Sequence, residues 1–141
     1  MRVVNRVKVA FAAAGFCLLP GALPVRAHHS FAAEYDSKKP VTVTGIVRKV
    51  EWTNPHSRMY LDVKDAKGVV TAWNFEFGSP NHLFRAGWTR NTVKEGDQIT
   101  VEGWAAKDGS HLAQTRQVIL ADGRKVPGFA SGTDSGGAPA Q

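Results

Sequence analysis

The sequence predicts an all-β domain that contains one short helix. Apolar and polar residues alternate with a period of two over several short stretches, as they do in half-buried strands. Clusters of turn-forming residues separate these stretches. A single segment between them has both a helix start and a helix end signal.

The first three predicted strands include one β-hairpin. Residues 58–64 and 69–77 alternate apolar and polar side chains, and residues 65–68 (Asp-Ala-Lys-Gly) predict the turn between them. The strand before this hairpin spans residues 41–52. Its apolar phase changes at Gly45, which predicts a bulge or a sharp bend that lets one strand serve two parts of a sheet.

A helix and a second hairpin follow. Residues 79–87 begin with Ser-Pro and end with glycine, the signature of a short helix. Residues 99–104 and 112–120 form the last strand pair, and residues 107–110 contain the Asp-Gly hairpin signal. The resulting order is β-β-β-α-β-β.

This order predicts a small five-stranded OB-like barrel. In that fold, the loop between strands one and two and the loop between strands four and five build the ligand face. A generic antiparallel barrel or sandwich of another topology is the alternative.

The first 27 residues predict a cleavable signal peptide and therefore export from the cytoplasm. Arg2, Arg6 and Lys8 precede an apolar run at residues 9–23, and small residues stand one and three positions before a cut after Ala27. The apolar run is short for a bilayer span, which needs about 20 residues, although a retained membrane anchor is the alternative. Cleavage would also remove the one cysteine of the chain, which excludes disulfides and cysteine-based metal sites.

The remainder of the chain divides into three parts. Residues 28–39 form an N-terminal segment, residues 40–126 the barrel domain, and residues 127–141 a tail rich in Gly, Ser, Ala and Pro that we expect to be disordered. After cleavage, 14 basic residues stand against 12 acidic ones, a formal net charge of +2. Nucleic-acid binding, which needs many basic residues to neutralise phosphates, is therefore not expected.

The clearest candidate for a functional site is a set of histidines. A chain that starts at His28 combines a terminal amine with the imidazoles of His28 and His29, and nitrogen donors of this kind suit Cu(II). His56 in the first inter-strand loop is the candidate third ligand, and His111 in the last hairpin is a weaker one. The alternative is that His56 only braces the turn and that His111 is simply exposed, because no His-x-x-His spacing is present.

A second group of residues predicts a partner-binding surface instead. Aromatic and arginine side chains are frequent anchors of interfaces. They would dock an envelope protein or a glycan, without a metal. The candidates are Trp52, Asn54, Pro55, Trp88 and Arg90.

No catalytic residues are predicted. The chain has no Gly-rich phosphate loop, no Gly-x-Ser-x-Gly elbow and no His-Glu-x-x-His motif. The sequence therefore predicts a non-enzymatic domain that binds a small ligand or a metal ion, with copper as the specific ion.

Several short motifs resemble a family of secreted bacterial proteins that carries a domain of unknown function. The resemblance implies a periplasmic location but does not indicate an activity. It extends from His28 to about Val126. Its most specific motif is Trp52-Thr53-Asn54-Pro55-His56. The other motifs are His28-His29-Ser30-Phe31-Ala32-Ala33-Glu34-Tyr35-Asp36, Phe77-Gly78-Ser79-Pro80-Asn81 and Gly87-Trp88-Thr89-Arg90.

Overall fold

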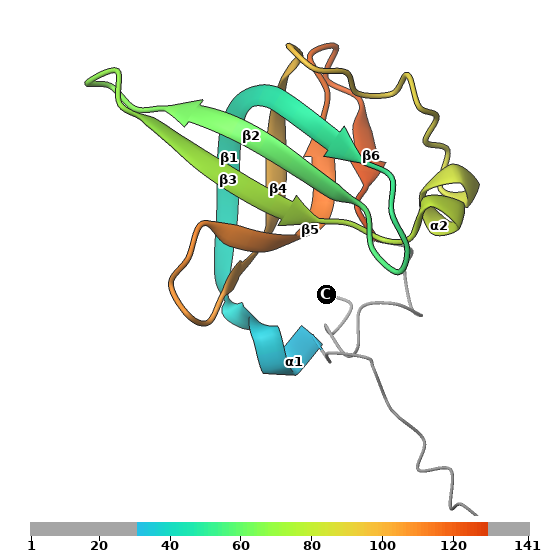
Figure 1. The fold of residues 1–141 in the computed structure, drawn as a ribbon, viewed down its shortest axis with the longest axis horizontal. Helices are drawn as coiled ribbons and strands as arrows, with labels where there is room; N and C mark the ends of the chain where they lie inside the picture. Colours follow the sequence, from blue (N-terminus) through green and yellow to red (C-terminus); the bar gives the residue numbers. More distant parts are fainter. Residues whose placement is uncertain (1–30, 130–141) are drawn as a thin grey trace, which may run out of the picture.

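The computed structural model describes residues 31–129 (Figure 1). The predicted signal peptide, His28 and His29 lie outside the described residues, as does most of the predicted tail. The elements in chain order are α1 (Phe31–Glu34), β1 (Tyr35–Glu51), β2 (Arg58–Lys64), β3 (Val70–Glu76), α2 (Pro80–Arg85), β4 (Gln98–Ala106), β5 (Leu112–Ile119) and β6 (Lys125–Pro127).

The strands form one mostly antiparallel sheet, which confirms the all-β class. Their order is β3-β2-β1-β4-β5-β6, and β3 also pairs with β5 in parallel, with Asn74 opposite Leu112 and Glu76 opposite Gln114. The sheet has six strands, so the expected count of five is wrong. The additional strand is β6, which pairs with β5 after a tight turn at Asp122 and Gly123.

Strand β1 bends and changes partner, as the glycine in its middle predicts. Its residues Pro40 to Ile46 pair with β4, whereas Ile46 to Glu51 pair with β2 (Figure 1). A Cβ atom at Gly45 would lie 2.8 Å from the carbonyl oxygen of Asp62, so the strands approach too closely there for a side chain. The register shift itself lies slightly later, between Val47 and Lys49.

The ordered domain extends further at both ends than residues 40–126. At the N-terminal end, Phe31 and Tyr35 are buried against Ala106, so this part of the predicted separate segment packs on the sheet. At the C-terminal end, Pro127 belongs to β6 and Phe129 is only 8% exposed. The tail boundary at Pro127 is therefore placed too early, because a short composition-biased stretch can still pair and bury one aromatic ring.

The main core lies between the strands and under α2. Trp88 belongs to this core at 3% exposure, and its indole N–H donates to the carbonyl of Pro127 at 2.7 Å. Ser79 is the N-cap of helix α2, as the sequence predicts. Its side chain accepts a hydrogen bond from the backbone N–H of His82. Within residues 31–129, neither helix has the length and hydropathy of a membrane span.

The closest approach between strands gives a test of the fold. A Cβ atom at Gly103, in β4, would lie 2.0 Å from the carbonyl oxygen of Gln114 in β5. We expect Gly103→Ala to lower the free energy of unfolding by about 1–3 kcal/mol, because the β4–β5 backbone must move apart. Urea denaturation of the variant and the parent measures this difference.

The matched control is Gly78→Ala. A Cβ atom there would meet its nearest neighbour, the Cβ of His82, at an ordinary 3.5 Å. We expect a change within about 0.5 kcal/mol for this variant. Equal destabilisation by the two substitutions would contradict the β4–β5 register.

Candidate functional site

A polar pocket of about 710 Å³ opens where the first inter-strand loop faces α1 and the β4–β5 hairpin. The structure thus brings together the two loops that we expected to share a ligand face. Charged and polar side chains contribute much of the lining. The lining residues are Ala33, Glu34, Thr53, Asn54, Pro55, His56, Arg58, Glu76, Ala106, Lys107, Asp108 and Leu112.

The most buried charged group of this pocket is the carboxylate of Glu76, at 5% exposure. Three donors from three different segments reach it. The phenol of Tyr35 donates to Oε2 at 2.8 Å, the guanidinium of Arg58 donates to the same oxygen at 3.3 Å, and Nδ1 of His56 lies 3.0 Å from Oε1. The register of the β2–β3 hairpin places Arg58 directly opposite Glu76, and Arg58 also donates to Asn74 at 3.4 Å.

These contacts keep Glu76 ionised. Burial by itself raises the pKa of a carboxyl group. In Glu76, the hydrogen bonds from His56 and Tyr35, together with the positive charge of Arg58, outweigh burial and lower the pKa below its ordinary value. Burial and the neighbouring Glu76 carboxylate raise the pKa of Tyr35, so its phenol remains protonated and able to donate.

The ionised carboxylate also fixes the state of the His56 ring. A carboxylate only accepts hydrogen bonds, so Nδ1 of His56 carries a hydrogen that points at Glu76. In the neutral ring the lone pair then resides on Nε2. The His56 ring also meets the ring of Phe129 edge to face, with centroids 5.7 Å apart, which holds it from a second side.

The described residues predicted from sequence lie in four places, and two of these places adjoin the first inter-strand loop. Asn54, Pro55 and His56 line the pocket, and the Asn54–Pro55 peptide bond is cis. Trp52 and Arg90 lie together on the other side of the same loop, beside α2.

Two further candidates are not in the pocket. Trp88, a candidate for the partner-binding surface, is buried in the core. His111 is exposed, and its ring contacts Trp73, with centroids 5.1 Å apart. His28 and His29 lie outside the described residues. In residues 31–129, no three His, Cys, Asp or Glu side chains are grouped so as to hold a metal ion.

The comparison with protein families covers most of the chain. A family model described as a family of unknown function, DUF6152, matches residues 16–115. The chain belongs to this family. The match includes every lining residue of the pocket, but ends before β6 and Phe129. No match is found among curated proteins.

Sequence reasoning missed three residues of the hydrogen-bond network around Glu76 in this DUF6152 domain: Tyr35, Arg58 and Glu76 itself. Alternation along β3 puts Glu76 on the face opposite Phe75 and Phe77, which reads as the solvent face. That face is covered by the start of β1, which the sequence predicted as a separate segment. A signal was present, because a glutamate between two phenylalanines lies opposite an arginine in the predicted hairpin.

The Glu76 network predicts how the stability of the DUF6152 domain depends on pH. The pKa of Glu76 in the folded state lies below its ordinary value of 4.5. The ionised carboxylate therefore contributes fully to the free energy of unfolding above pH 4.5, and this contribution is lost as the pH falls through the folded-state pKa. We expect Glu76→Gln to cost about 3 kcal/mol at pH 7. The difference from the parent shrinks between about pH 5 and pH 3, as measured by urea denaturation at each pH.

The control for this series is Glu95→Gln at an exposed position. We expect the free energy of unfolding of this variant to stay close to that of the parent throughout the series. If the cost of Glu76→Gln stayed constant down to pH 3, the carboxylate would not be the charged centre of the pocket.

Proposed function

We propose that this chain is an exported, non-enzymatic domain of the bacterial periplasm that binds a small ligand or a metal ion in the pocket around Glu76. The ion we propose is Cu(II). The observation that carries the proposal is the 3.0 Å contact between the Glu76 carboxylate and Nδ1 of His56 in the pocket wall. Metal-binding histidines almost always have such a carboxylate or carbonyl partner on the ring nitrogen that does not bind the metal.

The ligand atom that we propose on the domain is Nε2 of His56. Glu76 orients the ring and increases the basicity of the opposite nitrogen, which are the two effects of an outer-shell carboxylate. A single imidazole binds copper weakly, so further nitrogen donors are required. We propose that the imidazoles of His28 and His29, with the terminal amine of His28, provide them.

The position of α1 supports this arrangement. Ala33 and Glu34 line the same pocket as His56, and Phe31 is anchored in a small cluster with Tyr35 and Ala106. His28 is three residues before Phe31 in the sequence. Three residues span at most about 10 Å, and this short span supports the proposal that the start of the mature chain contributes nitrogen donors to the pocket.

We also propose that the sheet is an OB-like barrel with β6 as an addition. Support comes from the order of β1 to β5, with α2 between β3 and β4, and from the parallel contact between β3 and β5. In an OB-fold, the β1–β2 and β4–β5 loops surround the ligand. The pocket is lined by these same two loops.

The copper proposal gives a calorimetric prediction. The mature chain that starts at His28 binds Cu(II) close to one to one, and both His28→Ala and His56→Ala weaken binding by at least about 10- to 100-fold, because each removes a nitrogen donor. Binding also releases protons and weakens as the pH is lowered through the histidine range. Isothermal titration calorimetry in two buffers of different ionisation enthalpy measures both effects.

The matched control is His111→Ala, which removes an exposed imidazole outside the pocket. This variant retains full affinity. A double variant, His28→Ala with His56→Ala, that takes up copper as tightly as the parent would refute the site, provided its circular dichroism shows the native fold.

A second prediction concerns the processed N-terminus. Expression with its own leader in a Gram-negative host yields a periplasmic protein whose first residue is His28, because the small residues before the cut follow the signal-peptidase pattern. Intact mass and N-terminal peptide analysis of the periplasmic fraction measure this. Another first residue would remove the terminal-amine part of the copper site, and retention in the membrane would refute processing.

A further inference from the structure

The arginines of the described residues fall into two groups. Four of them form ion pairs with carboxylates: Arg48, Arg58, Arg116 and Arg124. Arg85 and Arg90 form no ion pair within residues 31–129, and both are exposed. Arg85 and Arg90 flank the end of α2, so the two arginines without a carboxylate partner are close together in the sequence.

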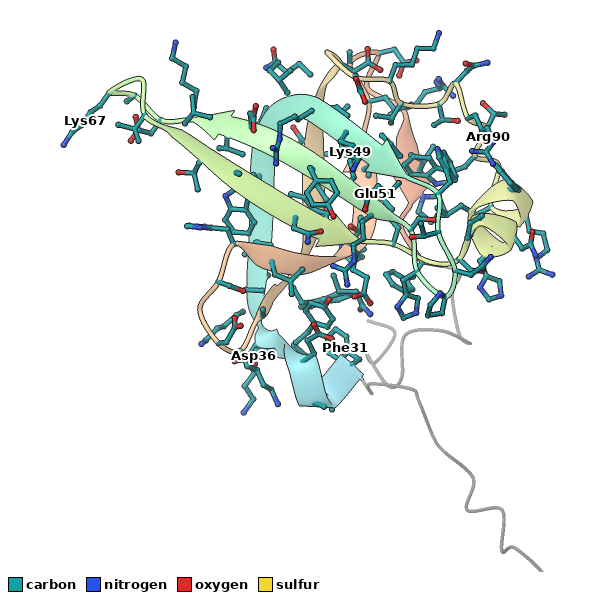
Figure 2. All side chains as sticks on the ribbon, viewed as in Figure 1. Phe31, Asp36, Lys49, Glu51, Lys67 and Arg90 are labelled. Atoms are coloured by element: carbon teal, nitrogen blue, oxygen red, sulfur yellow. The ribbon has the colours of Figure 1, made fainter. Side chains whose placement is uncertain are left out.

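Arg90 lies over a pair of stacked aromatic rings beside α2 (Figure 2). The rings of Trp52 and Phe84 stack with centroids 5.3 Å apart and an angle of 17° between their planes. The guanidinium carbon of Arg90 is 5.6 Å from the centroid of Trp52 and 6.0 Å from that of Phe84. Such cation–π contacts hold a guanidinium by its face, which leaves its N–H edges directed at potential acceptors.

The chain segment that carries Phe84 and Arg90 is basic and contains an exposed apolar group. No aspartate or glutamate occurs in residues 77–94, whereas this segment contains Arg85, Arg90 and Lys94. Phe84 is 40% exposed and is one of the few large apolar side chains at the surface of the described domain. A ligand that fits must therefore offer negative charge together with an apolar group.

We propose that Phe84, Arg85 and Arg90, supported from below by Trp52, form a docking surface for an acidic peptide segment of a partner protein. The carboxylates of the segment pair with the two guanidinium groups, which are suited to bidentate contacts with carboxylates. An apolar side chain of the segment covers Phe84. This surface is separate from the Glu76 pocket, and its proposal does not depend on copper binding.

Two other occupants fit the surface less well. A neutral glycan stacks on an open aromatic face, but Phe84 and Arg90 already cover Trp52. An anionic membrane would require a larger apolar area than the single exposed ring of Phe84. Charge complementarity therefore favours the acidic peptide.

The test uses a short fluorescein-labelled peptide of alternating aspartate and phenylalanine. Fluorescence anisotropy with the mature protein gives its Kd at low salt and at physiological salt. We expect saturable binding that weakens as salt is added. Substituting Arg85→Gln and Arg90→Gln together weakens it about tenfold or more, because each removes one unpaired cation.

The matched control is the double variant Arg48→Gln with Arg124→Gln, which removes two exposed arginines that already have carboxylate partners. This variant binds like the parent. Phe84→Ala also weakens peptide binding relative to the parent. The Trp52 indole resonance shifts when the peptide is added to the parent protein. His56→Ala leaves peptide affinity unchanged, which distinguishes this surface from the copper site.

Four results would overturn the proposal. They are the absence of peptide binding, equal loss in the two double-arginine variants, equal binding of a peptide with asparagine in place of aspartate, and displacement by inorganic phosphate at the peptide's own concentration. Binding of an N-acetylglucosamine oligosaccharide at the Trp52 indole, in place of the peptide, would assign the surface to a glycan instead.

Discussion

The buried carboxylate of Glu76 connects three segments of the described domain. It accepts hydrogen bonds from the start of β1 through Tyr35 and from β2 through Arg58, and it contacts the first inter-strand loop through His56. A charge of this kind is costly to bury unless it is fully paired. Its cost is offset only when these segments are in place together, and this requirement gives the pocket a defined geometry.

The loop between β1 and β2 has two chemically different sides. Toward α1 and the β4–β5 hairpin it presents Asn54, Pro55 and His56 to the pocket. Toward α2 it presents Trp52, which stacks on Phe84 and supports Arg90. One loop therefore contributes to two surfaces of different chemistry, a polar recess and a basic aromatic patch.

Much of the fold follows from the sequence because strand alternation and turn residues are local signals. The two hairpins, the helix after Ser79 and the bend at Gly45 all belong to this class. Strand β6 was missed because it has only three residues, ends in a proline and gains its stability from pairing with β5. The Asp-Gly pair before it resembles the turns that were recognised.

The site could be predicted only in part. The Asn-Pro-His corner was found because a histidine follows an Asn-Pro turn signal in the first inter-strand loop, and it does line the pocket. Glu76 and Tyr35 were missed because their partnership spans 41 residues of sequence, and neither is unusual in its own strand. Trp88 was proposed as an interface residue because of its aromatic type, but residue type alone does not show whether a tryptophan is exposed or buried in the core. Long-range burial is the information that a single sequence does not carry.

The two ends of the described domain contact one pair of interacting side chains, Glu76 and His56. Tyr35, near the beginning, bonds to Glu76, and Phe129, at the end, packs on the ring of His56. Contacts so far apart in sequence form late in folding, since the intervening loop must close first. As the chain emerges from the ribosome, the pocket consequently remains incomplete until Leu112 is free, and the His56 ring lacks its contact with Phe129 until the end of the described domain is free. Loading of a ligand would then follow folding rather than accompany it.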